Sequence, residues 1–276
     1  MSSRADATSW TAEVLATSRL SDHLVRLELG GAGLDGFSST GVPDEWVALT
    51  VPGQFQSRYY TVRSWDGTRL VLDVVLHDHG LVTEWASGSP VGDRVGIGAP
   101  KGSYAPPAGA GWVLLVGDLT ALPAIARILE DGTGVPTTVL LEADQGHAGL
   151  LPATDATITW SRPPAPAQSA LAAVVEDLDW PAGDGYFWMG GESSQMRAIR
   201  KHLMRERRLP SAAYDVMGYW RKPSARRTPA VDPGPIYRAG RAAGRSDAEI
   251  WADYDAAQER AQAVAQDPHQ DPEEGR

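Results

Sequence analysis

The chain has 276 residues, a formal net charge of −10 and a pI of about 5. This length allows two ordinary domains, and the acidity argues against nucleic acid or an acidic membrane surface as a partner. The absence of cysteine excludes disulfides, thiolate metal sites and iron–sulfur clusters, so redox chemistry would need a bound organic cofactor. No signal-peptide core or stretch of roughly 20 apolar residues is visible, so we expect a cytoplasmic protein, and a monomer.

The first hundred residues carry short runs in which apolar and polar residues alternate between glycine-containing turns. The runs are TAEVLATSRL, LVRLELGG, EWVALTVPG, RYYTVRSW, RLVLDVVLH and RVGIGAPKG. Short strands at this spacing, without a long helical period, predict a six-stranded antiparallel barrel. The stretch APPAGAG at 105–111 is typical of a linker, so we place the first domain at residues 1–106.

From residue 111 to 221, apolar strands alternate with helical segments. The strand-like runs are WVLLVGD, TTVLLEAD, TITWSR, YFWMGGE and YDVMGYW, and the helical runs are ALPAIARILE, SALAAVVEDLDW and SSQMRAIRKHLMRE. Such alternation implies right-handed crossovers and a parallel sheet. We therefore predict that residues 111–221 form a second, α/β domain.

Residues 222–276 divide into three parts. The segment from Lys222 to about Gly240 is rich in Pro, Arg, Ala and Gly, which predicts a loop. SDAEIWADYDAAQERAQAVA, at 246–265, begins with a Ser-x-x-Glu capping box and predicts a C-terminal helix. The composition of the remaining acidic residues predicts a disordered tail.

The strand RYYTVR at 58–63 departs from the pattern of a half-buried strand, in which one face is apolar. Alternation puts Arg58, Tyr60 and Val62 on one face, and Tyr59, Thr61 and Arg63 on the other. A flat ring with a phosphate tail, such as a flavin, would use Tyr60 for stacking and Arg58 for charge.

Two strand ends in the α/β half are suited to ligands. Gly117, Asp118 and Thr120 follow the first buried strand, where helix N-termini present free N–H groups to anions. Thr120 is equally a good N-cap, and Pro123 is tolerated in a first helical turn. Because the GxGxxG fingerprint is absent here, this segment alone leaves the ligand open.

The second strand end, YFWMGGESSQMRAIRKHL, repeats the pattern. Gly190 and Gly191 allow close approach to the backbone, and Glu192 is placed to meet a ribose or an amide. The alternative for Glu192 is a carboxylate favoured by the dipole at a helix start. A barrel followed by two such strand ends predicts two cofactors that meet between the domains.

Four segments, in this order, resemble the siderophore-interacting proteins, which are flavin-dependent ferric-siderophore reductases of the ferredoxin-reductase-like superfamily. They are RYYTVR, GDLTALPAIARILE, FWMGGESSQMRAIRKHL and GYWR at 218–221, and the resemblance runs from about Thr11 to Arg221. It implies FAD in the barrel domain and NADH or NADPH in the α/β domain. It also implies a ferric siderophore as the substrate, which releases its iron on reduction.

The resemblance implies cofactor contacts in both domains. The family's Arg-x-Tyr-Thr-x-Arg strand along FAD corresponds here to Arg58, Tyr60, Thr61, Val62 and Arg63. Its pyrophosphate segment corresponds to HDHGLVTEWA, with His77, Gly80, Thr83, Trp85 and Ala86, although Leu81 and Val82 replace the usual Pro-Ala. Its nicotinamide motifs correspond to Asp118, Thr120, Ala121 and Glu192, with Leu119 in place of a usual Glu.

Three further points rest on the residues themselves. Thr83 begins a possible helix and could donate its hydroxyl to a phosphate. His77 and His79 share a strand face as metal ligands can, but two ligands do not make a metal site, and we expect none. Arg162, after TITWS, is a candidate for the 2′-phosphate of NADPH, although a solvated arginine is the simpler reading and the choice of dinucleotide stays open.

Charge is unevenly distributed near the C-terminus: ten Lys or Arg accompany two acids in residues 197–227, and nine acids accompany two bases in residues 247–276. A local positive field would steer anionic ferric complexes into an otherwise acidic protein. We expect the acceptor site to be bordered by Arg221, Lys222, Arg226 and Arg227, with Tyr219 and Trp220 packed against the ligand or the flavin. The alternatives are two solvated faces of opposite charge, or a basic segment that docks the acidic helix.

Two rival functions remain open at this level. One is a flavin reductase of the same architecture with another acceptor, and the other is a non-catalytic protein that binds a siderophore or flavin. Fold and flavin motifs do not name the acceptor, so the first rival is compatible with every segment above.

Overall fold

The computed structural model describes residues 9–54, 56–77, 80–165 and 168–221, with isolated positions Ile236, Ala239, Ala243, Arg245 and Ala257. The predicted loop, C-terminal helix and acidic tail lie outside the described ranges. The chain divides into two compact units, and the one formed by Met1–Pro52 and Ser57–Lys222 holds every strand and helix described below. Among the described residues, no helix is long and apolar enough to cross a membrane.

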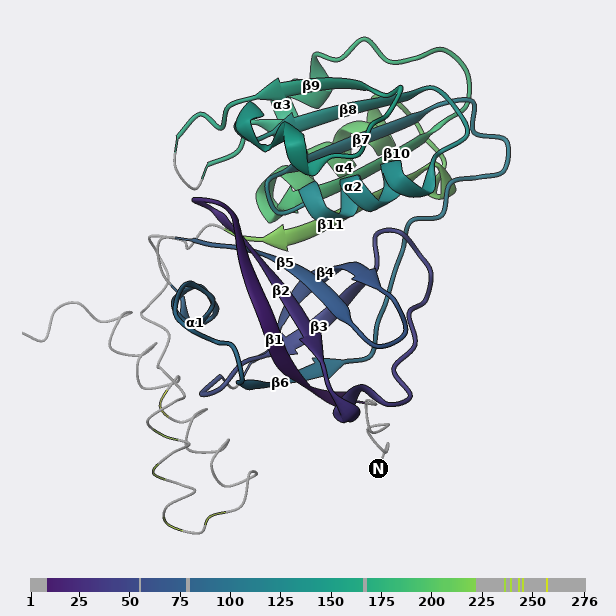
Figure 1. The fold of residues 1–276 in the computed structure, drawn as a ribbon. Helices are drawn as coiled ribbons and strands as arrows, with labels where there is room; N and C mark the ends of the chain where they lie inside the picture. Colours follow the sequence, from purple (N-terminus) through teal and green to yellow (C-terminus); the bar gives the residue numbers. More distant parts are fainter. Residues whose placement is uncertain are drawn as a thin grey trace, which may run out of the picture. The chain divides into compact units, whose positions relative to one another are not determined.

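Six strands close into an antiparallel barrel, as the six alternating runs predict (Figure 1). The strands are β1 (Ser9–Ser21), β2 (Leu24–Gly30), β3 (Trp46–Thr50), β4 (Arg58–Trp65), β5 (Leu70–Val75) and β6 (Arg94–Gly98), in the order β1-β2-β5-β4-β3-β6. A short 3-10 helix, η1 (Ala32–Leu34), follows β2, and α1 (Leu81–Ser87) lies between β5 and β6. Alternate strand residues fill the barrel core, among them Val14, Leu27, Val47, Val62, Leu72 and Ile97.

Five parallel strands form the second sheet, in the order β11-β10-β7-β8-β9. They are β7 (Val113–Asp118), β8 (Thr137–Glu142), β9 (Thr157–Ser161), β10 (Tyr186–Glu192) and β11 (Tyr214–Trp220). The connections contain α2 (Leu122–Asp131), η2 (Gln145–Leu150), α3 (Leu171–Glu176), α4 (Ser193–Arg205) and η3 (Ser211–Ala213). The predicted fold class, a barrel followed by a parallel α/β sheet, is confirmed. We propose 106 and 111 as the domain limits, because β6 ends at Gly98 and β7 begins at Val113.

Helices cover both faces of the parallel sheet, which explains why its central strands are apolar throughout (Figure 1). Leu115 of β7 packs with Ile125 of α2 in one apolar layer. The neighbouring Leu114 packs with α3 and α4 in the other layer, through Leu171 and Ile199. Strand alternation therefore distributes β7 between two separate cores.

Two helices begin at residues other than those predicted. The N-cap of α2 is Ala121 rather than Thr120, and it makes no side-chain capping bond. Thr120 instead donates its backbone N–H and its hydroxyl to Asp118, which removes the hydroxyl from capping. Pro123 lies in the first turn of α2, as expected. The helix predicted near Thr83 starts two residues earlier, after Gly80, whose φ of 132° suits glycine.

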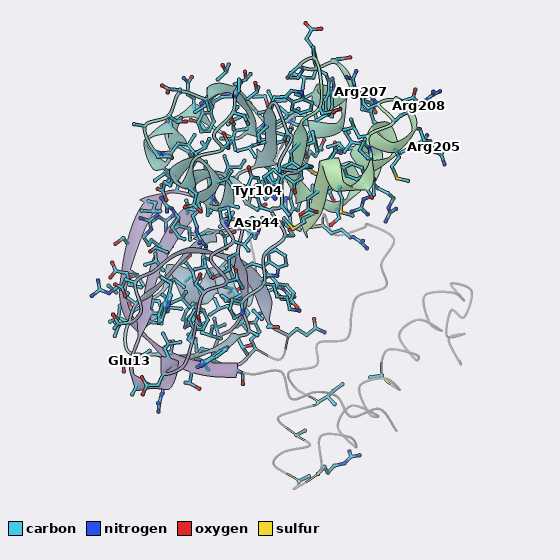
Figure 2. All side chains as sticks on the ribbon, turned by 90° about the vertical axis from the view of Figure 1, so that its right-hand side faces the viewer. Glu13, Asp44, Tyr104, Arg205, Arg207 and Arg208 are labelled. Atoms are coloured by element: carbon cyan, nitrogen blue, oxygen red, sulfur yellow. The ribbon has the colours of Figure 1, made fainter. Side chains whose placement is uncertain are left out.

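A buried carboxylate, Asp44, joins the loop before β3 to the segment after β6 and to β10. It accepts hydrogen bonds from the backbone N–H groups of Ser103 (2.8 Å) and Tyr104 (3.0 Å), and the Asp44 and Tyr104 side chains are neighbours in Figure 2. Its other oxygen accepts from the Ser103 hydroxyl (2.8 Å) and from the Trp188 indole N–H (3.1 Å). A single side chain thus connects the barrel to the parallel sheet.

Candidate functional site

The carboxyl edge of the parallel sheet brings the predicted strand-end residues together. Asp118 at the end of β7 pairs in register with Glu142 of β8, which in turn pairs with Ser161 of β9. On the other side, Glu192 of β10 pairs with Trp220 of β11. Ligands of open α/β sheets bind outside this edge, so the register places the predicted nicotinamide residues where the fold binds ligands.

Asp118 connects three strand ends through its carboxylate. It accepts from the Thr120 backbone N–H (2.9 Å), the Thr120 hydroxyl, the Trp220 indole N–H (2.6 Å) and the backbone N–H of Glu192. Burial raises the pKa of Asp118, and these hydrogen bonds oppose that rise because they favour the ionised form. The carboxylate fixes the Trp220 indole at the sheet edge.

Glu192 occupies the N-cap position of α4. Its carboxylate accepts from the backbone N–H groups of Ser194 (2.6 Å) and Gln195 (3.2 Å) and from the Ser194 hydroxyl. This geometry matches the alternative stated for Glu192, a carboxylate at a helix start. A cofactor contact by Glu192 remains a prediction.

The first half of β4 has an open side in its strand pairing. Residues 58–61 pair with β3, from Arg58 with Leu49 to Thr61 with Trp46. Pairing with β5 begins only at Val62, which faces Leu72. A planar group can lie along the open side and meet backbone N–H and C=O groups.

Arg58 and Tyr60 lie on this open stretch, as the flavin prediction requires. Arg58 is exposed, and its guanidinium donates to the carbonyl of the adjacent Ser57 (3.3 Å). Tyr60 is half-buried against the barrel core, and burial raises its pKa to about 12, so it is a neutral phenol at physiological pH. The pair supplies a ring and a cation on one strand face.

Two other predicted residues of this strand, Val62 and Arg63, make contacts within the protein. Val62 is 0 % exposed in the barrel core, so its side chain has no access to a cofactor, and its carbonyl accepts from Arg127 of α2. Arg63 forms a bidentate ion pair with Glu130 of α2, one contact being 2.7 Å. These two positions connect β4 to α2, and the FAD contacts predicted for Val62 and Arg63 remain predictions.

The segment around α1 carries the remaining predicted FAD residues. The Thr83 hydroxyl accepts from the His77 backbone N–H (3.1 Å), which leaves its O–H to donate. Trp85 packs against the barrel core and donates its indole N–H to Asp93 (2.8 Å), so its ring has a structural role. Ala86 is buried in the same core. Asp78 and His79 lie outside the described residues, and no group of three or more His, Asp or Glu is placed to hold a metal within the part that the structure describes.

Tyr219 and Ala121 serve packing at the sheet edge. Ala121 is fully buried, and a Cβ on Gly117 would lie 2.4 Å from its own Cβ. The Tyr219 ring packs edge-on to Trp188, with the ring centroids 6.4 Å apart, and burial raises the pKa of its hydroxyl. Tyr219 is half-buried at the sheet edge, and its predicted contact with the ligand or the flavin remains a prediction.

The described basic residues of this run do not gather at one place. Arg221 is exposed and follows Trp220 at the sheet edge, whereas Lys222, Arg226 and Arg227 lie outside the described residues. Three exposed arginines surround the far end of α4: Arg205, Arg207 and Arg208 (Figure 2). Thirteen helical residues separate the two ends by about 20 Å, so these three arginines do not border the edge.

Sequence reasoning missed Asp44, which is fully buried, and the exposed ring of Tyr59. An aspartate in a polar loop ordinarily lies in solvent, so composition gave no signal for the first. For the second, the alternation of β4 places Tyr59 opposite Tyr60, but only the structure reports its exposure.

The comparisons with known proteins agree with this geometry. Residues 110–223 match the model described as siderophore-interacting protein, and residues 54–104 match the siderophore-interacting FAD-binding domain. The NADPH-dependent ferric-chelate reductase of Escherichia coli K12 is 28 % identical over 233 residues, covering 73 % of this chain and 90 % of that protein.

Two solved structures share the fold. A siderophore utilization protein from T. fusca has a TM-score of 0.67 and 29 % identity, covering 79 % of this chain and 94 % of that one. The ferredoxin reductase in carbazole 1,9a-dioxygenase has a TM-score of 0.62 at 16 % identity, covering 78 % and 70 %, and shares the fold alone. The two matched family models together span more than half of the sequence. The chain belongs to the siderophore-interacting protein family.

Proposed function

We propose that this protein is an FAD-dependent reductase that uses NADH or NADPH to reduce ferric siderophore complexes and release ferrous iron. The observation that carries the proposal is the position of Trp220. Its indole donates to Asp118 at the dinucleotide edge of the sheet, and its ring lies 6.4 Å from that of His77 in the predicted flavin segment. One residue therefore connects the two predicted cofactor regions within a single compact unit.

The described residues fit FAD. Tyr60 offers a ring and Arg58 a cation on one face of β4, and the backbone of residues 58–61 offers polar groups on the open side. The Thr83 O–H and the backbone at Gly80 suit the pyrophosphate. When bound there, FAD would supply the chemistry that converts a two-electron donor, the nicotinamide, into one-electron reduction of ferric iron.

The chain's own groups bind and orient rather than transfer protons. Asp118 and Thr120 form the dinucleotide edge together with Trp220, whose indole is fixed by its bond to Asp118. Ferric iron is a hard ion held by siderophore oxygens, and reduction weakens that hold, so no general base is needed for release. The acceptor approaches beside Arg221, where the exposed cation favours an anionic complex.

The test is an anaerobic titration of the FAD-loaded protein with NADH and with NADPH. Bleaching of the flavin absorbance, followed by reoxidation and ferrous iron release when a ferric siderophore is added, is the expected result. A protein that binds FAD but is bleached by neither dinucleotide would be a carrier. A protein that is bleached but reoxidised by no ferric complex would be a flavin reductase with another acceptor.

A further inference from the structure

The segments RYYTVR and GDLTALPAIARILE contact each other through their second halves. Arg127 of α2 donates from its guanidinium to the carbonyl of Val62 in β4 (2.5 Å). One turn further along α2, Glu130 forms the bidentate ion pair with Arg63, the next residue of β4. Residues three apart lie on one face of a helix, so one face of α2 holds two neighbouring residues of β4. No cofactor contact is predicted for Arg127 or Glu130, so their position needs another explanation.

Strand β4 is irregular at the residues that α2 holds. Val62 and Ser64 pair with consecutive residues of β5, so Arg63 is one extra residue on its strand. A β-bulge of this kind bends the strand and increases its twist, and bulges are frequent next to active sites, where they direct side chains. Residues 58–61 come directly before the bulge, and their pairing is with β3. The bulge therefore sets the direction of the stretch proposed to hold FAD.

Val62 is anchored at this point by its side chain and by its backbone. Its side chain is 0 % exposed in the barrel core, and its backbone N–H donates to the carbonyl of Glu45, the residue before β3 (2.8 Å). Its carbonyl accepts from the Arg127 guanidinium, and a hydrogen bond from a charged donor is stronger than one from a neutral donor. The backbone of β4 is thus attached both to the barrel and to α2.

Helix α2 extends this attachment to the dinucleotide edge. It starts at Leu122, immediately after the strand-end residues 118–121, and its apolar face is buried against the parallel sheet. Arg127 lies about 8 Å along the helix axis from Leu122. Tyr60 lies about 7 Å along β4 from Val62. A short path through packed elements therefore joins the dinucleotide edge to the flavin stretch, and the bond between Arg127 and Val62 links its two halves.

We propose that Arg127 is a positioning residue for flavin reduction: by holding the Val62 carbonyl at the bulge, it fixes the FAD-binding stretch of β4 relative to the dinucleotide edge. In that step the dihydronicotinamide loses a hydride and is oxidised, and the flavin gains the hydride and is reduced. Transfer needs the two rings close and aligned, so a displaced strand slows it. The proposal rests on the proposed function and adds a residue to its site. The competing explanation is a bond that only stabilises the packing of α2 on the barrel.

Three substitutions separate these explanations. Arg127→Met removes the donor and keeps a long side chain. Arg127→Lys keeps a charged donor, and lysine can replace arginine here because the bond to Val62 uses a single guanidinium nitrogen. Arg19→Met is the matched control, because Arg19 also donates to a backbone carbonyl, that of Asp22 at 2.8 Å, in the turn between β1 and β2.

The FAD-loaded full-length proteins are mixed anaerobically with increasing NADH or NADPH, whichever bleaches wild type faster. Arg127→Met should lower the limiting rate of bleaching by about 10- to 100-fold, because misplaced reacting groups slow the chemical step. Its half-saturating dinucleotide concentration should stay within about twofold of wild type, since the dinucleotide contacts are intact. The visible circular dichroism of the bound flavin, which reports the orientation of the ring, should change. Arg127→Lys and Arg19→Met should match wild type in all three measurements.

An unchanged limiting rate and an unchanged dichroism for Arg127→Met would overturn the proposal. A loss confined to dinucleotide binding, a lysine variant as slow as the methionine variant, or an equal loss in Arg19→Met would overturn it as well. If Arg127→Met does not fold, Glu130→Gln decides, because it weakens the adjacent contact at a side chain that is 38 % exposed. The limiting rate of Glu130→Gln should fall by about 2- to 5-fold, and an unchanged rate would count against the proposal.

Failure of the proposed function is a separate result. Wild type that binds FAD and is bleached by neither dinucleotide would overturn the reductase function. Arg127 would then be judged by the dichroism of the bound flavin alone. A spectrum changed in Arg127→Met but not in Arg19→Met supports its hold on the flavin strand, and an unchanged spectrum overturns it.

Discussion

Replacing Asp44 with alanine should strongly destabilise the protein, because it removes an acceptor that both halves of the fold share. The carboxylate is fully buried and accepts four hydrogen bonds. The donors are the two backbone N–H groups of Ser103 and Tyr104, the Ser103 hydroxyl and the Trp188 indole. Alanine would leave these donors in a space that the native fold closes to solvent.

The size of the loss follows from the number of stranded donors. The Ser103 hydroxyl also lies 3.1 Å from the sulfur of Met217 and can turn toward it, so three donors lose their acceptor. Each buried donor without an acceptor costs about 1–3 kcal/mol, and entering water relieves part of the sum. We expect the free energy of unfolding to fall by about 3–5 kcal/mol. For a protein of this size the unfolding temperature would fall by about 6–20 °C.

The assay is urea and thermal unfolding of the FAD-loaded protein, followed by tryptophan fluorescence. Asp44→Asn keeps one acceptor oxygen but turns an NH₂ group toward a donor, so it should lose about 1–3 kcal/mol. The exposed Asp155→Ala is the matched control and should change stability by less than about 0.5 kcal/mol. A double-mutant cycle with Trp188→Phe isolates the bond that joins barrel and sheet.

A loss below about 1 kcal/mol for Asp44→Ala would refute the reasoning, since that is less than the cost of one stranded donor. Strict additivity of Asp44→Asn and Trp188→Phe would refute the specific role of the indole bond. The asparagine cycle keeps the question answerable if the alanine variant does not fold.

Four further outcomes are expected. Tyr60→Ala should weaken FAD binding by about 2- to 12-fold through lost stacking, and an unchanged dissociation constant would remove Tyr60 from the site. Arg162→Ala should raise the KM for NADPH about tenfold and leave the KM for NADH unchanged. An unaltered ratio of the two KM values would exclude a contact between Arg162 and the 2′-phosphate. Burial raises the pKa of Asp215, so the folded protein holds the carboxyl proton of Asp215 more tightly than the unfolded chain does. The free energy of unfolding of wild type should therefore fall as the pH rises from the ordinary carboxyl pKa through the raised pKa of Asp215. Asp215→Asn should lack this loss, and parallel stability curves from about pH 4 to 7 would contradict it. Changing Arg226 and Arg227 to Ser should slow turnover of an anionic ferric complex and flatten its salt dependence, whereas equal rates and slopes would place the acceptor elsewhere.

The local pattern of apolar and polar residues was sufficient to predict the barrel and the parallel sheet. Each of the six alternating runs became a barrel strand, and each strand-helix alternation became a parallel crossover, because side-chain period and turn residues act within a few positions. The strand ends at Asp118 and Glu192 were predictable for the same reason, since a parallel sheet brings the ends of its strands to one edge.

Side-chain direction was the part that local pattern missed. RYYTVR has no uniformly apolar face because the strand changes its surroundings along its length. Arg58 is exposed, Val62 is buried in the barrel, and Arg63 is paired with Glu130. The local pattern did not show that Val62 is buried or that Arg63 is paired, and the cofactor contacts predicted for these two residues remain predictions.

The sequence by itself determined that this protein has a barrel followed by a parallel α/β sheet. It also determined the family and the strand ends suited to cofactors. The tertiary structure decided which of those residues are exposed and which hold the fold together. The deciding partners are far apart in the chain: 67 residues separate Arg63 from Glu130, 102 separate Asp118 from Trp220, and 144 separate Asp44 from Trp188. Propensity and periodicity act over a few residues, whereas these bonds exist only after the barrel and the sheet have packed.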